Sequence, residues 1–77
     1  MNDGEWRINA KGLSNPGPRL MVENALAQAG GRPLRVIVSE AAAAEDLKAY
    51  FKKLGRVYEI DEIGEEFHIL VAALKDS

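Results

Sequence analysis

The 77-residue sequence contains no cysteine, a single histidine, and only one tryptophan, two tyrosines and two phenylalanines. The absence of cysteine excludes disulfide bonds, thiolate metal sites and every mechanism that needs a thiol. A single histidine excludes a metal cluster built on several imidazoles. We therefore expect a fold held by packing alone, and no cofactor.

Long apolar runs are also missing. No stretch approaches the roughly 18 apolar residues of a membrane span, and no basic segment followed by an apolar run marks a signal peptide. The composition, 47% hydrophobic and 29% charged, is typical of globular proteins. We expect one domain over residues 1–77 and a cytoplasmic location.

Positive charge is scarce, since the net charge is -2 and the pI is near 5.3. General nucleic-acid binding draws most of its affinity from clustered Lys and Arg, so this composition argues against it. A small basic patch formed by Arg7, Lys11 and Arg19 remains open.

The first half of the chain has the pattern of a strand, a helix and a second strand. Residues 5–9 alternate polar and apolar, with Trp6 and Ile8 on one face. Residues 19–29 carry an apolar stripe at helical spacing, and two glycines follow. Residues 33–39 are β-branched and nearly all apolar, which predicts an interior strand. The helical stripe consists of Val22, Ala25, Leu26 and Ala29.

The second half predicts a helix and two more strands. Ser39 is positioned to cap a helix over residues 40–54, whose buried stripe would be Leu47, Tyr50, Phe51 and Leu54 together with alanines from 41–44. Residues 56–62 alternate as in an edge strand, 63–65 form a hairpin turn, and 67–74 are apolar enough for the middle of a sheet.

The predicted order is β-α-β-α-β-β. Two right-handed crossovers place both helices on one face of a four-stranded mixed sheet, which gives an α/β two-layer sandwich. The other face would be open to solvent or to a partner. The residues expected to line it are Arg7, Arg35, Ile37, His68 and Leu70.

The stretch between the first strand and the first helix reads Lys11-Gly12-Leu13-Ser14-Asn15-Pro16-Gly17-Pro18. It resembles the Arg-Gly-Leu-x-Cys-Pro-x-Pro motif of the TusA/SirA/YedF-like family of small sulfur-carrier proteins. The segment 39–47 is similar to the family's second-helix opening, and the resemblance extends from Ile8 to about Ala73. It implies the strand order 1-2-4-3.

The resemblance also implies a mechanism, in which the motif cysteine carries a persulfide received from a cysteine desulfurase. A thiol at a helix N-terminus is favoured as its anion there. In this sequence Asn15 occupies the cysteine position, and a carboxamide neither ionises near neutrality nor forms a persulfide. The family's activity therefore does not carry over to this position, and the sequence predicts no catalytic residue.

Several interpretations of Asn15 stay open. It could be the N-cap of the first helix, with Pro16 at the first helical position. It could contact a partner or a small ligand, or it could be an engineered replacement of a natural cysteine. The helix N-terminus could also bind an anion through the amides of Asn15 and Gly17, helped by Lys11 and Arg19.

Two other features have simpler readings than catalysis. His68 is more readily an open-face or hydrogen-bonded residue than a catalyst. The acids around the hairpin form a solvated rim more readily than a cation site, because they lack the spacing of a calcium loop. These acids are Glu59, Asp61, Glu62, Glu65 and Glu66.

The leading hypothesis is a non-catalytic relative of the sulfur carriers that acts as a binding or regulatory module in sulfur or selenium metabolism. By resemblance, its partner would be a protein of sulfur transfer. The alternatives are a sulfur carrier whose motif cysteine has been replaced by Asn15, and an RNA-binding module suggested by fold alone. The candidate binding residues are Lys11, Gly12, Leu13, Asn15, Pro16, Pro18 and Arg19.

Overall fold

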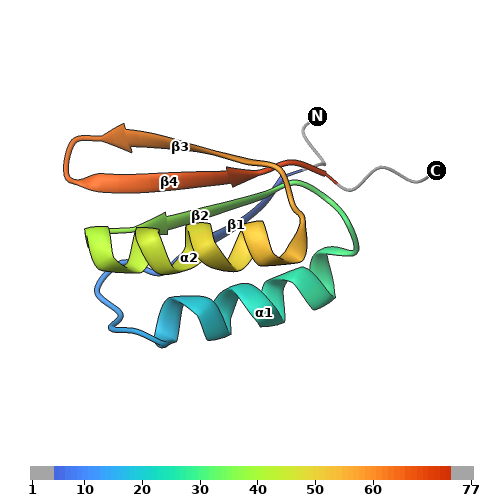
Figure 1. Ribbon diagram of the computed structural model, residues 1–77, viewed down its shortest axis with the longest axis horizontal. Coiled ribbons are helices and arrows are strands. Elements are labelled where there is room, and N and C mark those ends of the chain that lie inside the picture. Colours follow the sequence, from blue (N-terminus) through green and yellow to red (C-terminus); the bar gives the residue numbers. More distant parts are fainter. Residues whose placement is uncertain (1–4, 74–77) are drawn as a thin grey trace.

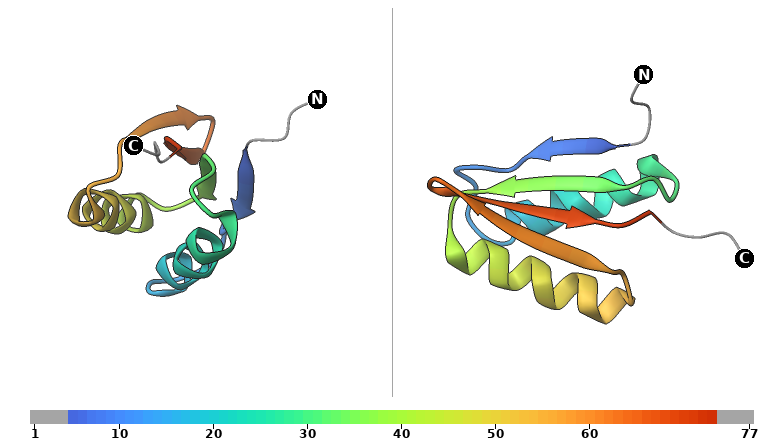
Figure 2. Two further views of the ribbon diagram at one scale, coloured as in Figure 1. Left: turned by 90° about the vertical axis from the view of Figure 1, so that its right-hand side faces the viewer. Right: turned by 90° about the horizontal axis from the view of Figure 1, so that it is seen from above.

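The computed structural model describes residues 5–73 and has two layers, a four-stranded sheet and a pair of helices (Figure 1). The elements are β1 (Trp6–Asn9), α1 (Gly17–Ala29), β2 (Leu34–Val38), α2 (Ala41–Leu54), β3 (Tyr58–Ile63) and β4 (Glu66–Val71). Both helices lie on the same side of the sheet, as Figure 2 shows from the end and from above.

The sheet order is β1-β2-β4-β3. β1 and β2 run parallel, whereas β4 is antiparallel to both β2 and β3. The predicted β-α-β-α-β-β order and the 1-2-4-3 arrangement are confirmed. Leu74, the last residue of the predicted fourth strand, lies outside the described residues.

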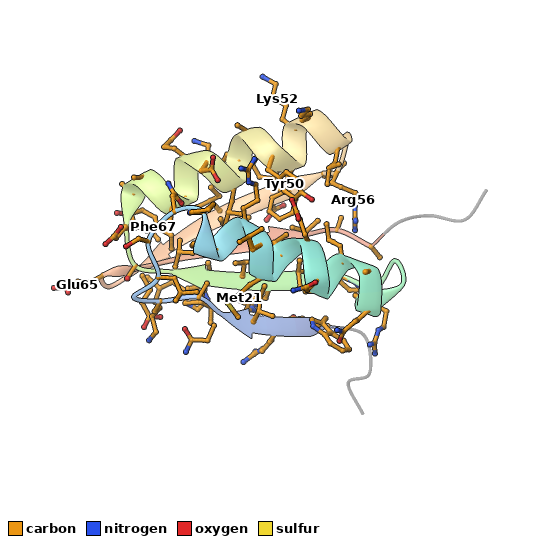
Figure 3. All side chains as sticks on the ribbon, turned by 90° about the horizontal axis from the view of Figure 1, so that it is seen from below. Met21, Tyr50, Lys52, Arg56, Glu65 and Phe67 are labelled. Atoms are coloured by element: carbon orange, nitrogen blue, oxygen red, sulfur yellow. The ribbon has the colours of Figure 1, made fainter. Side chains whose placement is uncertain are left out.

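The core lies between the sheet and the helices. Val36 and Ile69 from the two central strands and Leu47 and Phe51 from α2 are fully buried. α1 contributes Val22, which is also fully buried. Tyr50 lies between the two helices (Figure 3), where burial raises the pKa of its hydroxyl.

One predicted core residue is not in the core. Leu54 is 47% exposed, because α2 ends there and Gly55 turns the chain away with a left-handed φ of 75°. Ala43 and Ala44 are buried, as predicted for the alanines of 41–44.

The predicted cap of the second helix is wrong. Glu40, not Ser39, is the N-cap of α2, and it makes no side-chain cap hydrogen bond. The Ser39 hydroxyl accepts a hydrogen bond from the backbone N–H of Gly12 at 3.3 Å, so it serves the loop after β1 instead of the helix. Among residues 5–73, no helix has the length and apolar character needed to cross a membrane.

The open face of the sheet has the predicted residues. Cross-strand pairing places Arg35 between Arg7 and Leu70, and Ile37 beside His68. Arg35, Ile37, His68 and Leu70 are half-buried, whereas their neighbours along the strands are buried on the helix side, except for the half-buried Phe67. Alternation along each strand therefore separates an apolar, helix-covered face from a polar one.

Candidate functional site

The turn between β1 and α1 is held by hydrogen bonds at both of its ends. The Asn9 side-chain oxygen accepts from the Lys11 N–H at 3.0 Å, and the Ala10 carbonyl accepts from the Leu13 N–H at 3.4 Å. At the far end, the Ser14 carbonyl accepts from the Gly17 N–H at 2.7 Å. These contacts define the turn's shape without any contribution from the Asn15 side chain.

Glycine has a structural reason at one position of this turn, and a second glycine lies in a tight contact. Gly12 has a φ of 83°, a conformation that L side chains rarely adopt. At Gly17, a Cβ atom would approach the Cβ of Leu13 to 3.2 Å. Leu13 therefore lies against Gly17, the residue at which the helix begins.

The prediction that Asn15 caps α1 is wrong. The helix begins at Gly17, its N-cap is Pro16, and there is no side-chain cap hydrogen bond. The Pro16 carbonyl accepts the first helical bond from the Leu20 N–H at 3.0 Å. The turn closed by Ser14 and Gly17 occupies the residues that would otherwise form the first helical turn, so Asn15 lies one position before the cap. The Asn15–Pro16 peptide is cis.

Most of the candidate binding residues form one exposed surface. Gly12, Leu13, Asn15 and Pro16 are all exposed, and Leu13 is 38% exposed despite its apolar side chain. Pro18 is different, because it is fully buried in the core. It holds the start of α1 against the sheet and is not available for contact.

The two basic residues of the turn each have an acidic partner. The Lys11 ammonium lies 2.6 Å from the Glu66 carboxylate on β4, and the Arg19 guanidinium lies 4.0 Å from Asp46 on α2. Arg7 pairs with Glu5 at 3.1 Å. Each of the three residues of the predicted basic patch is therefore paired with an acid, and they do not form an uncompensated cationic cluster.

An anion site at the helix N-terminus loses one of its two expected amide donors and the help of both basic side chains. The Gly17 N–H is bonded to Ser14, and Pro18 has no N–H. Lys11 and Arg19 face carboxylates rather than the helix start. Phosphate binding by the turn is therefore not supported by its geometry.

A chain of polar side chains links the turn to the open face of the sheet. Arg35 donates to Glu5 at 2.7 Å on one side and contacts His68 Nδ1 at 3.0 Å on the other. His68 Nε2 lies 3.0 Å from Glu66, which also binds Lys11. We call these residues, together with Arg7, the polar chain: Arg7, Glu5, Arg35, His68, Glu66 and Lys11.

The donors in the polar chain fix the form of the histidine. Arginine has only N–H donors, so Nδ1 of His68 must accept, and the neutral ring carries its hydrogen on Nε2. That N–H then donates to Glu66. His68 is thus a hydrogen-bonded residue of the open face, as predicted.

Both carboxylates of the polar chain are held in their charged form. The Arg35 hydrogen bond, with help from Arg7, lowers the pKa of Glu5 below its usual value. The Lys11 hydrogen bond, followed by that of His68, lowers the pKa of Glu66. Glu66 therefore does not belong to a purely solvated acidic rim. Within residues 5–73, no group of three or more acidic or histidine side chains is arranged to hold a metal ion.

The polar chain was only partly predictable. The alternation of the strands placed Arg7, Arg35 and His68 on the open face, but their pairing with Glu5 and Glu66 depends on the register between strands far apart in sequence. The sequence did contain one indication of these pairs, because charged or ionisable residues stand at alternate positions in residues 5–9 and 66–68.

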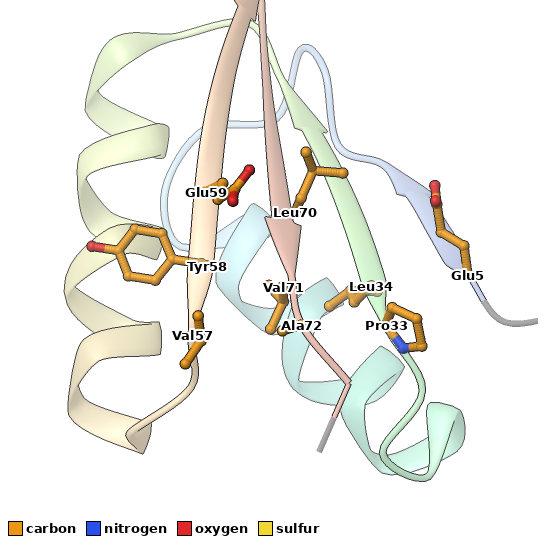
Figure 4. Close-up of a pocket in the computed structure, with 9 residues that line it drawn as sticks. All are labelled: Glu5, Pro33, Leu34, Val57, Tyr58, Glu59, Leu70, Val71 and Ala72. Carbon is orange, nitrogen blue, oxygen red and sulfur yellow. The ribbon is translucent and has the colours of Figure 1, made fainter. Parts of the chain in front are cut away.

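A separate hollow of about 220 Å³ lies at the opposite end of the sheet from the turn (Figure 4). Leu70 and Pro33 supply apolar surface, and the carboxylates of Glu5 and Glu59 stand on either side of it. It shares no residue with the candidate turn. The lining residues are Glu5, Pro33, Leu34, Val57, Tyr58, Glu59, Leu70, Val71 and Ala72.

Comparison with known proteins agrees with this fold. A SirA-like protein from Desulfitobacterium hafniense, known from its crystal structure, superposes with a TM-score of 0.81 at 24% identity, covering 90% of this chain and 97% of that one. At this identity the likeness concerns the fold alone. No curated protein matches the chain.

A family model matches most of the chain, including the turn that carries the sequence resemblance. The family model described as sulfurtransferase TusA matches residues 7–73, which include the turn, both helices and all four strands except Trp6. Members of this family act with protein partners in sulfur transfer. The chain belongs to the sulfurtransferase TusA family.

Proposed function

We propose that this chain is a non-catalytic member of its family, which acts as a binding or regulatory module in sulfur or selenium metabolism. The observation that carries the proposal is the turn itself. Its backbone is held by hydrogen bonds at both ends, and yet the position that resembles the family's sulfur-carrying cysteine holds Asn15. A surface kept in shape without its nucleophile is suited to recognition.

Persulfide chemistry has no atom to act on in this sequence. Cysteine is absent from all 77 residues, and the Asn15 carboxamide cannot replace a thiolate as nucleophile. The polar chain offers no substitute, because its histidine is bonded at both ring nitrogens and lies on the open face.

The proposed contact surface consists of the exposed part of the turn. Leu13 supplies an apolar anchor, and Leu20, 53% exposed on the first turns of α1, adds to it. Pro16 restricts the backbone of the turn and so lowers the entropy lost when the turn is immobilised by a partner. Lys11 and Arg19 stand at the two ends as charged rim residues. We propose a protein of sulfur transfer as the partner, with Pro18 holding the surface in place from below.

The test is affinity capture from the native host, with the wild-type chain and two matched variants as baits. Leu13→Glu places a charge in the proposed surface. Val57→Glu makes the same kind of change at an apolar residue that is 71% exposed at the opposite end of the sheet. Captured proteins are identified by mass spectrometry, and the affinity of each is measured by calorimetry.

We expect a sulfur-transfer protein to be recovered by wild type and Val57→Glu, and its affinity for Leu13→Glu to fall at least about tenfold, as for loss of an interface anchor. Arg19→Ala should weaken binding less, because rim charges contribute little. If Leu13→Glu and Val57→Glu bind alike, the turn is not the binding surface. If no specific partner is recovered, the binding hypothesis itself is abandoned.

A second candidate is favoured by the exposure of position 15. If the natural gene encodes cysteine there, its thiol would be accessible immediately before α1, and the protein would be a sulfur carrier. Sequencing the source gene decides this. In Asn15→Cys, we expect a thiol with a pKa below the free value of about 8.5, detected as rapid alkylation near neutral pH. An ordinary alkylation rate would show that the turn does not activate the position.

A further inference from the structure

His68, on β4, has one ring nitrogen against a base and the other against an acid. Nδ1 lies 3.0 Å from the Arg35 guanidinium of β2, and Nε2 lies 3.0 Å from the Glu66 carboxylate of its own strand. Nδ1 accepts a hydrogen bond only while it carries no hydrogen, so the ring is neutral in this arrangement. Histidine is also the side chain that ordinarily changes its charge near neutral pH. The contact with Arg35 therefore depends on the ring remaining neutral.

A second proton on the ring binds at Nδ1, the nitrogen that faces Arg35. The imidazolium then directs an N–H at the N–H of Arg35 over 3.0 Å, so that two donors and two positive charges oppose each other. The side chain of His68 is only 13% exposed and that of Arg35 only 22%, so little water is present to screen the two charges. This contact is lost once the ring is charged.

The outer contacts of the two residues survive protonation. Arg35 keeps its hydrogen bond to Glu5 at 2.7 Å, and the His68 contact with Glu66 becomes an ion pair. Both carboxylates stay charged while histidine titrates, because the pKa of each is held below its usual value of 4.5. Protonation therefore breaks the central link of the polar chain and strengthens the link beside it.

The charges around His68 come from both neighbouring strands and from its own strand, on the side of the sheet away from the helices (Figure 2). Arg35 on β2 disfavours the imidazolium, whereas Glu66 on β4 and Asp61 on β3 favour it. Asp61 is the direct cross-strand partner of His68, so their side chains share a face. It places an acid beside the ring for the hydrogen that Nδ1 gains. Further charged groups on this face or at its end are Glu5, Arg7, Lys11 and Glu59.

We propose that the polar chain is a pH-sensitive switch, which divides between Arg35 and His68 when the ring is protonated. One half then consists of the two arginines with Glu5, and the other of His68 with Glu66 and Lys11. In the neutral form, side chains connect the turn to the β1–β2 side of the sheet, and in the acid form only the backbone ladder does. The Arg35 guanidinium loses one of its two partners and becomes available to an acidic group of another molecule.

The test follows the side-chain nitrogens of both residues by NMR while the pH is lowered from about 8 to about 5. The ring nitrogens of His68 report the tautomer and the binding of the second proton, and the guanidinium signals of Arg35 report the loss of contact. We expect the hydrogen on Nε2 at the higher pH, and a change at Arg35 with the same midpoint as the ring. The amide spectrum of the same samples should remain that of the folded protein.

Two substitutions of His68 separate the roles of its ring nitrogens. In His68→Asn, the side-chain oxygen takes the place of Nδ1 and accepts from Arg35 without titrating, so the Arg35 signals should not change with pH. In His68→Gln, the amide nitrogen takes the place of Nε2 and no acceptor replaces Nδ1. The Arg35 signals should then resemble those of the acid form of wild type at every pH. Both variants lack the imidazole, so its general loss affects them alike.

The acid on β3 provides a quantitative check. Asp61→Asn should make His68 bind its second proton about twofold more weakly, because an opposite charge directly across the strands is lost. Glu62→Gln is the matched control, since Glu62 is the next residue of β3 and pairs with Phe67 on the other face of the sheet. It should leave the midpoint of the His68 titration close to that of wild type.

Three results overturn the switch. Arg35 signals that stay constant while His68 titrates show that the two side chains do not separate. A neutral ring with its hydrogen on Nδ1 lacks the acceptor on which the switch depends. A pH-dependent change at Arg35 that persists in His68→Asn has another cause. Equal effects of Asp61→Asn and Glu62→Gln overturn the role of Asp61. These measurements need no other protein, so they test the switch independently of the proposed function.

Discussion

The two faces of the sheet are stabilised by different forces. The helix-covered face buries Val36 and Ile69 completely among apolar neighbours. The open face has no covering layer within residues 5–73, and its order comes from the polar chain, whose links span 2.6 to 3.1 Å. The comparison shows that one sheet can be packed on one side and cross-linked by charge on the other.

We expect the largest loss of stability from a substitution in the helix-covered face. Ile69→Ala should lower the free energy of unfolding by about 2–5 kcal/mol, because it removes a fully buried side chain and leaves a cavity. Leu70→Ala is the matched control, one residue further along β4 and on the half-buried open face, and should cost less than half as much. Urea unfolding measures both, and equal losses would mean that the two faces are packed alike.

We expect the next largest loss of stability from a substitution at the centre of the polar chain. Arg35→Met keeps most of the side-chain volume but leaves Glu5 and His68 without their shared donor. Because Arg35 is only 22% exposed, we expect a loss of about 1–3 kcal/mol in urea unfolding. Arg7→Met, at the exposed end of the same chain, should cost much less. If the order is reversed, the polar chain does not hold the open face.

A smaller effect concerns pH. The folded state lowers the pKa of Glu5 and Glu66 below their usual value of 4.5. For such acids, the stabilising contribution is complete well above that value and is lost as the pH falls through the lowered pKa. We expect the unfolding free energy to decrease below about pH 4.5, and the decrease to be shallower in Glu5→Gln/Glu66→Gln. Parallel curves for variant and wild type would contradict this.

We expect the smallest change in stability from a substitution in the turn between β1 and α1. Lys11→Met should change stability little, because its ion pair with Glu66 is partly exposed. It should nevertheless raise the pKa of Glu66, since Lys11 is the largest cause of the lowering. Carbon-detected NMR titration of the carboxyl group measures this shift. Lys48→Met, which removes a similar pair on α2, should leave the Glu66 titration unchanged.

The sequence patterns were sufficient to predict the order of helices and strands and the two faces of the sheet, because alternation and helical spacing are local patterns. The strand order 1-2-4-3 was implied by the family resemblance. The sequence also located the family turn, in which glycine and proline have direct steric roles. It failed at both helix starts, where Asn15 and Ser39 are good caps by propensity but neighbouring segments compete for the same residues. Ser39 bonds Gly12, and the turn closed by Ser14 and Gly17 precedes α1.

The ion pairs within the polar chain could not be predicted from the sequence, for a related reason. Glu5 and Arg35 come from different strands, as do Lys11 and Glu66, and only the assembled register brings them within bonding distance. Composition shows that acids and bases are present, but not which of them meet. The neutralisation of Lys11 and Arg19, which removes the basic patch, is a consequence of that assembly.

The ion pair between Lys11 and Glu66 joins residues 55 positions apart. Contacts between residues so distant in sequence carry the cost of closing a long loop, and they form after local ones. The turn that would meet a partner thus acquires its last brace only when β4 has joined the sheet. During synthesis, a chain that ends before residue 66 would hold β1, α1 and β2 without that ion pair, and the turn would keep only its local hydrogen bonds until β4 is added.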